Sequence, residues 1–193
     1  MCFHFKQSKS EEFFRARGLR GHPVNGVYNG FSHPSINVVT QESPKEIKHF
    51  MWGLIPSWAK NDDIKKYTLN ARHETLKTKP SFKNAKRCLI FSDGFYEWKW
   101  LDKQGKKKQK YLIELPNSEL FSFAGLYDQW INKQTGEIIN SCSIITTEAK
   151  GVMREIHNSK MRMPMIVECN QKEDWLKGNE IKLFYNFIIS KVQ

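Results

Sequence analysis

Short runs of apolar and β-branched residues recur along most of the chain, separated by polar segments that contain glycine, proline or asparagine. Runs of this length bounded by turn residues are typical of β-strands. We therefore expect strands over residues 36–40, 47–52, 87–91, 95–100, 111–115, 120–125, 138–147 and 163–168. The segment 102–105 (DKQG) joins two of these runs and predicts a hairpin with a lysine-rich tip.

Three segments carry helix signals instead. Residues 9–17 follow Ser8 and have Glu11 spaced as in a capping box, which predicts a first helix. A second helix is expected over 71–77, and a third over 170–178, which opens on an asparagine and ends at a glycine. No internal repeat or linker interrupts the chain, so many strands with few helices predict one α+β domain over residues 1–193 with a strand-dominated core.

The composition excludes two classes of protein and suggests a partner. Of the 193 residues, 39% are hydrophobic and 13% aromatic, which is enough for a buried core and excludes general disorder. The chain has no run of about 18 apolar residues, so we expect no membrane span. Lys and Arg number 31 against 20 Asp and Glu, and the net charge of +11 favours a polyanion such as nucleic acid. The alternative is that the charge serves solubility alone.

The four cysteines, at positions 2, 88, 142 and 169, bear on metals and location. No pair has the CxxC spacing of a zinc site, so we expect no metal and no other cofactor. The N-terminus lacks the apolar core of a signal peptide, which predicts a cytoplasmic protein without disulfides. Cys88, Cys142 and Cys169 lie in or beside apolar runs and are expected in the core.

Cys2 lies outside any apolar run and directly follows the initiator methionine. Aminopeptidases remove Met1 when the next side chain is small, and the new terminus would be a 1,2-aminothiol. Its α-amine, with a reference pKa of about 7.7–8.0, is partly neutral at pH 7 and can condense with an aldehyde. The thiol can then close on the imine carbon to give a five-membered thiazolidine. The alternative is that position 2 belongs to an unstructured terminus.

Two tryptophans bracket an irregular stretch, residues 52–60 (WGLIPSWAK). Aromatic rings beside basic residues form stacking platforms for unstacked bases. Trp52 ends a strand and is expected in the core, whereas Trp58 suits either the core or a base.

A polar group follows at residues 69–76 (LNARHETL). Asn70 is suited to orient a carbonyl or hydroxyl, and Arg72 to bind a phosphate. On the helix expected here, Asn70 and Glu74 share one face, so Glu74 is equally a structural support.

The third candidate segment is residues 92–100 (SDGFYEWKW), in which strand alternation places Phe95, Glu97 and Lys99 on one face. Glu97 is a lone carboxylate among aromatic residues, where desolvation would raise its pKa toward general acid–base duty. The alternative is an exposed strand glutamate.

The fourth candidate segment is residues 154–167 (REIHNSKMRMPMIV). His157 is the candidate proton shuttle because histidine titrates near neutrality, although a lone histidine is often structural. Lys160 and Arg162 are candidate phosphate contacts.

Taken in order, these motifs resemble those of the SOS response-associated peptidase (SRAP) family, whose members include bacterial and human proteins that shield abasic sites. They are MC at the start, WGLIPSWAK, LNARHETL, DGFYEWKW with its hairpin, FSFAGLYDQW and IHNSKMRMPMIV. The resemblance extends from Cys2 to about Val167. It implies an open barrel or sandwich of mostly antiparallel strands with a few short helices, and we expect a monomer.

The resemblance also implies an enzyme that processes its own N-terminus and crosslinks through Cys2 to abasic sites in single-stranded DNA. By this resemblance, Asn70 positions the ring-opened sugar and Glu97 interacts with the α-amine. His157 would promote opening of the deoxyribose and reversal of the crosslink. The matching DNA contacts are Arg72, Arg162 and the wedge aromatic Trp58.

One departure from the family and two other functions bear on this interpretation. The family usually begins MCGR, whereas this chain has Phe3 and His4, which removes a flexible glycine and a candidate phosphate-binding arginine. A thiol hydrolase of peptides with Cys2 as nucleophile and His157 as base remains open. So does a non-covalent reader of modified DNA, whose binding would not depend on Cys2.

Overall fold

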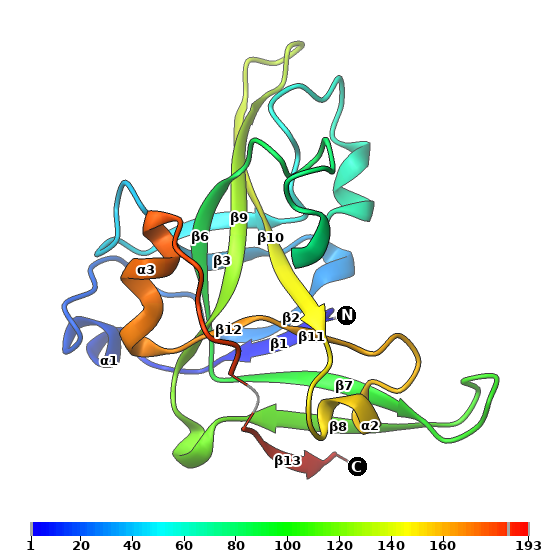
Figure 1. Cartoon of the computed structure of the whole chain (residues 1–193). Coiled ribbons are helices and arrows are strands. Elements are labelled where there is room, and N and C mark those ends of the chain that lie inside the picture. Colours follow the sequence, from blue (N-terminus) through cyan, green and yellow to red (C-terminus); the bar gives the residue numbers. More distant parts are fainter. Residues whose placement is uncertain (1, 185, 193) are drawn as a thin grey trace.

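The computed structural model describes residues 2–184 and 186–192, which form two β-sheets with a few short helices (Figure 1). The strands are β1 (His4–Gln7), β2 (Gly26–Asn29), β3 (Ser35–Thr40), β4 (Lys48–Trp52), β5 (Asn70–Arg72), β6 (Lys86–Ser92), β7 (Gly94–Trp100), β8 (Lys108–Glu114), β9 (Phe121–Ile131), β10 (Ile138–Glu148), β11 (Arg162–Pro164), β12 (Ile166–Val167) and β13 (Ile188–Lys191). The α-helices are α1 (Glu11–Arg15), α2 (Met153–Ile156) and α3 (Lys172–Lys177). Short 3₁₀ turns lie at Gly30–Ser32, Asp63–Tyr67, His73–Thr75, Pro116–Ser118 and Cys169–Gln171. The expected strand-dominated α+β fold is confirmed.

A closed barrel forms the larger sheet. Within the described residues, its strands follow the order β10-β4-β3-β6-β9, and β9 pairs back onto β10 to complete the ring. Closure is possible because β9 and β10 are each 11 residues long, so β9 pairs with β6 on one side and β10 on the other. The pairing of β4 with β10 is parallel, while the other pairs of the ring are antiparallel. The barrel is therefore closed, where the sequence predicted an open barrel or a sandwich.

The smaller sheet has the order β13-β8-β7-β1-β2 and lies across one end of the barrel (Figure 1). Its inner face packs Phe5 and Phe95 against Phe123 of the barrel, and all three side chains are fully buried. β1 pairs with β7 from His4 opposite Tyr96 and continues in the direction of Gly94. The last four residues of β7 therefore extend beyond the start of β1, and the functional residues gather at this edge.

Local signals predicted some element boundaries and missed others. The first helix begins at Glu11 because Ser10 caps it, its Oγ accepting the Phe13 N–H at 3.3 Å. Ser8, the expected cap, instead hydrogen-bonds through its backbone N–H and its hydroxyl to Asp93 Oδ2. The third helix ends as expected at Gly178, which has a φ of 95°. Strands β1, β2 and β13 were not predicted.

The helix expected over 71–77 is wrong. Asn70 to Arg72 form strand β5, which runs parallel to β10 with Asn70 opposite Ile144 and Arg72 opposite Thr146. A 3₁₀ turn at His73–Thr75 follows it. Pairing with an already formed barrel strand satisfies the backbone of this segment and overrides its local propensity.

The cysteines divide into a buried and an exposed set. Cys88 and Cys142 are fully buried, as expected, and Trp52 is also buried in the core. Cys169 is exposed at the start of a 3₁₀ turn, so its expected place in the core is wrong. In the described part of the chain, no helix has the length and apolar character that a membrane crossing requires.

Candidate functional site

Cys2 lies two residues before the first residue of β1, His4, and is fully buried against the barrel core. The Asn70 side chain holds it in place by donating from Nδ2 to the Cys2 carbonyl oxygen at 2.9 Å. The other amide atom, Asn70 Oδ1, is buried and has no hydrogen-bond partner among the described residues. An unstructured position 2 is therefore excluded, and Asn70 retains a hydrogen-bond acceptor for another group.

Glu97 lies on the inner face of β7 with Phe95 and is only 3% exposed, so the alternative of an exposed glutamate is wrong. Burial raises the pKa of its carboxyl to about 7, as expected for a carboxylate among aromatic residues. Burial, together with the neighbouring Glu97, also raises the pKa of the Cys2 thiol well above its usual value. The thiol is therefore neutral at rest, and the carboxyl beside it is poised to exchange a proton near pH 7.

His157 faces Glu97 across the site, with Nε2 lying 3.6 Å from Glu97 Oε2. Its other ring nitrogen, Nδ1, accepts the backbone N–H of Arg162 at 3.1 Å. A neutral imidazole whose Nδ1 accepts a hydrogen bond carries its proton on Nε2, so His157 points an N–H into the site.

The pKa of His157 is far from neutrality. Burial, together with the positive charges of Arg162 and Lys160, lowers its pKa to about 3. The backbone N–H that occupies Nδ1 acts in the same direction, because a second ring proton would point at that donor. The expectation that His157 titrates near neutrality is therefore wrong, and its neutral form is a hydrogen-bond donor at physiological pH.

Asn158 fixes the distance between the loop that carries His157 and the strand that carries Glu97. Its Oδ1 accepts the Trp100 backbone N–H at 3.0 Å, and its Nδ2 donates to the Trp100 carbonyl at 2.9 Å. One side chain thus pairs with the free edge of β7 as a strand would. Sequence reasoning missed Asn158, and its only signal was its position next to His157 in a candidate motif.

Arg162 is held by a network inside the protein. Its guanidinium donates to both carboxylate oxygens of Glu74, at 2.9 and 3.0 Å, and to the Thr146 carbonyl at 2.6 Å. The Arg162 side chain is 11% exposed. Glu74 therefore supports Arg162, where the sequence suggested support of Asn70, and the network fixes the backbone N–H that holds His157.

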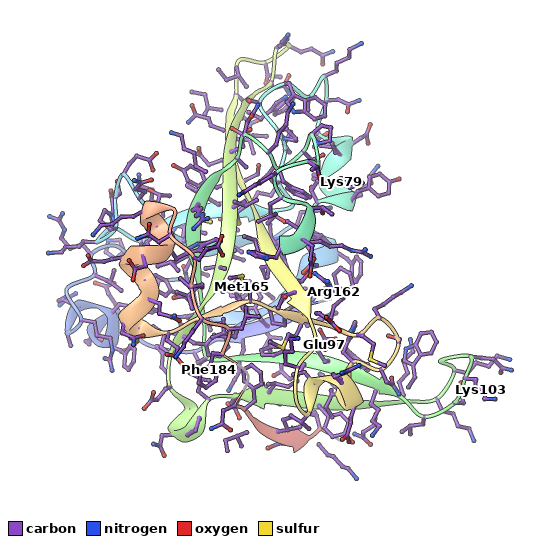
Figure 2. All side chains as sticks on the ribbon, viewed as in Figure 1. Lys79, Glu97, Lys103, Arg162, Met165 and Phe184 are labelled. Carbon is purple, nitrogen blue, oxygen red and sulfur yellow. The ribbon has the colours of Figure 1, made fainter. Side chains whose placement is uncertain are left out.

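The remaining candidates lie on the surface. Trp58 is 54% exposed and donates from Nε1 to the Pro80 carbonyl at 3.3 Å. Arg72, on β5, and Lys160, in the loop after α2, are both exposed. Figure 2 shows Glu97 and Arg162 in the middle of the molecule, whereas Lys103 marks the far tip of the β7–β8 hairpin.

A hollow of about 240 Å³ opens onto the buried pair Glu97 and His157. Its remaining lining residues are Phe3, Trp98, Trp100, Lys108, Ser159 and Lys160. Within the described part of the chain, no three His, Cys, Asp or Glu side chains gather where they could hold a metal ion. The hollow brings together a carboxyl whose pKa is about 7, a fixed N–H donor and a basic, aromatic entrance, and the Cys2 thiol lies buried nearby, close enough to Glu97 for the carboxyl to raise its pKa.

Comparison with known proteins identifies relatives of this chain. The family model described as SOS response associated peptidase (SRAP) matches residues 1–186. The abasic site processing protein YoqW of Bacillus subtilis (strain 168) is 42% identical over 159 residues, which are 76% of this chain and 68% of that protein. The abasic site processing protein HMCES of Gallus gallus is 33% identical over 165 residues, covering 72% of this chain and 47% of HMCES. The chain thus spans about half the length of HMCES.

The fold is also found in a solved structure. An X-ray structure of a protein from Bacteroides thetaiotaomicron superimposes with a TM-score of 0.88 at 32% identity, covering 100% of this chain and 92% of that one. The family match covers nearly the whole chain, and this structure shares its architecture from end to end. The chain therefore belongs to the SOS response-associated peptidase family.

Proposed function

We propose that the protein processes abasic sites in single-stranded DNA by forming a thiazolidine crosslink through Cys2 after Met1 is removed, as part of the DNA damage response. The observation that carries the proposal is a cysteine at position 2 beside a buried carboxyl whose pKa is about 7. The names of the relatives, abasic site processing proteins, agree with this substrate. We place this activity in the cytoplasm and in a monomer.

The chemistry balances without a cofactor. The ring-opened abasic deoxyribose presents an aldehyde at C1, and the neutral α-amine of Cys2 adds to it to give a carbinolamine. Loss of water forms the C1=N imine. The thiol sulfur then bonds to C1 while its proton moves to the nitrogen, which closes the thiazolidine. Converting the C1 carbonyl to a saturated centre protects the strand, because β-elimination requires that carbonyl.

Glu97 is the acid–base group in this series of reaction steps. A carboxyl with a pKa of about 7 is present in both protonation states at neutral pH, so it can accept a proton from the amine or thiol and return it to the departing water. The same transfers in reverse would release the DNA. The Cys2 thiol needs such a base because burial raises its pKa.

His157 has a different role from Glu97. Its Nε2–H, fixed by the Arg162 N–H on Nδ1, donates a hydrogen bond to Glu97 or to the sugar oxygen as the hemiacetal opens. A hydrogen bond to the ionised form stabilises Glu97 as the base. Asn70 completes the pocket, because its Oδ1 is available to accept from a sugar hydroxyl.

The surface residues would hold the DNA around the lesion. Arg72 and Lys160 are exposed and are assigned to phosphates, and Trp58 is assigned to the base beside the abasic nucleotide. Arg162 as a phosphate contact remains a prediction, since its guanidinium already binds Glu74.

We assign the peptidase activity in the family's name to removal of the residue that precedes Cys2, which frees the α-amine. A general peptide hydrolase with His157 as base is less well supported. The pKa of His157 lies at about 3, and its Nδ1 is occupied by a backbone N–H, so it is a poor acceptor for a thiol proton.

Intact-mass measurement tests the proposal directly. The purified protein is incubated with a single-stranded oligonucleotide that carries one abasic site. The expected product has the mass of the protein without Met1 plus the DNA minus one water. A species that retains Met1 and still forms the adduct, or the absence of any adduct with wild-type protein, would contradict it.

A further inference from the structure

The outer face of the smaller sheet carries an aromatic and basic surface that begins at the hollow beside Glu97 and His157 and extends beyond it. Along β7, Tyr96, Trp98 and Trp100 alternate with Glu97 and therefore point away from it. On β8, Lys110 lies opposite Trp98 and Lys108 opposite Trp100, so both lysines share that face. We call these five residues the aromatic–lysine face.

Distances within the aromatic–lysine face show that it is a continuous surface. The Lys110 Nζ lies 4.3 Å from the centre of the Tyr96 ring, and the Lys108 Nζ lies 5.8 Å from the centre of the Trp100 ring. The ring of His4, on the neighbouring strand β1, lies 5.0 Å from that of Trp98 at an angle of 64°. The three aromatic side chains are half-buried, so each has ring surface left for a ligand.

The aromatic–lysine face continues into the hollow that opens onto Glu97 and His157, which we call the catalytic hollow. A second hollow, of about 530 Å³, is lined by Trp98, Lys108, Gln109, Lys110, Lys191 and Val192. Trp98 and Lys108 also line the hollow that opens onto Glu97 and His157. An extended ligand that leaves the catalytic hollow along this face would therefore contact Trp98 and Lys108 first and Lys110 next.

The charge of this surface is uncompensated. Elsewhere, Lys6 pairs with Glu114 at 2.7 Å and Lys86 with Glu42 at 2.9 Å. Among the described residues, neither Lys108 nor Lys110 forms an ion pair with a carboxylate, and the lining of the larger hollow contains no acidic side chain. Adjacent lysines without counter-charges repel one another, and polyanion phosphates would relieve that repulsion.

We propose that the aromatic–lysine face binds the single-stranded DNA that continues from the abasic nucleotide, with a base stacked on Trp98 and phosphates held by Lys108 and Lys110. This inference rests on the proposed function for the identity of the nucleotide in the catalytic hollow. Base stacking on aromatic rings beside lysines is tolerant of sequence. The aromatic–lysine face therefore adds affinity and sets the path of the DNA strand without selecting a base.

The first test measures binding of an undamaged oligo-dT by fluorescence anisotropy across a salt series. In single strands, each neutralised phosphate contributes about 0.7 to the slope of log affinity against log salt. The double variant Lys108→Ala/Lys110→Ala should therefore flatten the slope by about 1.4. The control Lys45→Ala/Lys133→Ala removes the same charge from turns outside the smaller sheet and should keep the wild-type slope. Equal slopes in the two double variants would overturn the proposal.

The second test separates stacking from packing at Trp98. Stacking of one base is worth about 1–3 kcal/mol, so Trp98→Leu should weaken oligo-dT binding about 5- to 150-fold, whereas Trp98→Phe should bind nearly as wild type. Thermal melts of both variants show whether the sheet is intact. Equal affinity of folded Leu and Phe variants would refute the stacking role.

Both tests use DNA without an abasic site, so their outcome is independent of the crosslinking chemistry. If wild-type protein fails to crosslink abasic DNA but the lysine variant flattens the slope, the proposed function is wrong and the binding face stands. If crosslinking proceeds but the salt slope of the lysine variant and the affinities of the Trp98 variants match wild type, the binding face is refuted and the proposed function stands. For the path itself, Lys110→Ala, which changes the larger hollow and not the lining of the hollow at Glu97 and His157, should raise the half-saturating concentration for crosslinking a 12-mer with a central abasic site. The same variant should leave an abasic trimer unaffected, and an equal effect on both lengths would refute the path.

Discussion

The barrel interior and the edge of the smaller sheet both bury a cysteine, and they do so with different neighbours. Cys142 in the barrel is fully buried with Ile144 and Phe123 in the same core cluster, and burial raises the pKa of its thiol. Cys2 is as deeply buried, but Asn70 holds its backbone and Glu97 lies close enough to influence its pKa. Burial alone makes a thiol inert, so the polar groups buried with Cys2 are the reason that we propose Cys2, and not Cys142, as the reactive thiol.

Burial also explains why the pKa values of Glu97 and His157 shift in opposite directions. Burial disfavours the charged form of each group, so the carboxyl rises to about 7 while the imidazole falls to about 3. The two groups lie 3.6 Å apart, and both are mainly neutral between about pH 3 and pH 7.

The largest effect is expected from replacing each of the two cysteines, Cys2 and Cys142, by alanine. Cys2→Ala removes the sulfur that closes the ring, so the stable adduct should vanish and leave at most an imine that borohydride can trap. Cys142→Ala is the matched control, because it removes an equally buried thiol and should leave the adduct yield unchanged. Gel shift under denaturing conditions measures both. A stable adduct with Cys2→Ala would show that sulfur takes no part.

The next largest effect concerns proton transfer. Glu97→Gln keeps the shape of the side chain but removes the proton exchange, and general acid–base groups typically contribute about 10²–10⁴-fold to a rate. Single-turnover crosslinking should slow by that order. His157→Gln should slow formation and reversal less, because it removes a hydrogen-bond donor and leaves the base in place. A larger loss with His157→Gln than with Glu97→Gln would reverse the assigned roles.

Stability should respond to pH in opposite directions at the two residues. The folded-state pKa of Glu97 lies above its unfolded value near 4.5, so wild type loses stability as pH rises from 4.5 to 7. At about 1.4 kcal/mol per pKa unit, Glu97→Gln should gain about 3 kcal/mol relative to wild type between pH 4 and pH 8. Chemical denaturation at both pH values measures this gain, and a constant difference would mean that Glu97 is not buried in solution.

The lowered pKa of His157 predicts the reverse. Its folded-state value of about 3 lies below the unfolded value near 6.5, so wild type loses stability as pH falls from 6.5 toward 3. His157→Gln should therefore gain stability relative to wild type at pH 4 but not at pH 8. Cys142→Ala, in the barrel, should show a difference from wild type that does not vary over this pH range.

The smallest expected effect is that of Asn158→Ala. Losing two hydrogen bonds to the Trp100 backbone should loosen the His157 loop against β7 and slow crosslinking about tenfold. The barrel analogue is Ser141→Ala, because Ser141 Oγ accepts the Ile55 N–H at 2.7 Å and neither residue lines the hollow at Glu97 and His157. It should lower the melting temperature and leave the rate unchanged. Equal crosslinking rates for both variants would show that the hydrogen bonds of Asn158 do not position His157.

Sequence pattern predicted most of the barrel strands. Strand alternation places Glu97 on the same face as Phe95, but this period does not say which face is inside, so the choice between a buried and an exposed Glu97 needed the structure. Strand β5 was predicted as a helix because its pairing with β10 joins residues about 75 positions apart, and no local pattern encodes that pairing. The pKa of His157 was missed for the same reason, because the N–H that occupies its Nδ1 depends on the turn before β11.

The assignment of Glu97 as the base is tested most directly by the pH dependence of crosslinking in wild type and Glu97→Gln. With a pKa of about 7, the ionised fraction of Glu97 rises about tenfold between pH 6 and pH 8. Ionisation of the α-amine affects both proteins, so the ratio of their single-turnover rates isolates the carboxyl. The account predicts that the ratio of wild-type to Glu97→Gln rates rises about tenfold over this interval. A ratio that stays constant from pH 6 to pH 8 would contradict it.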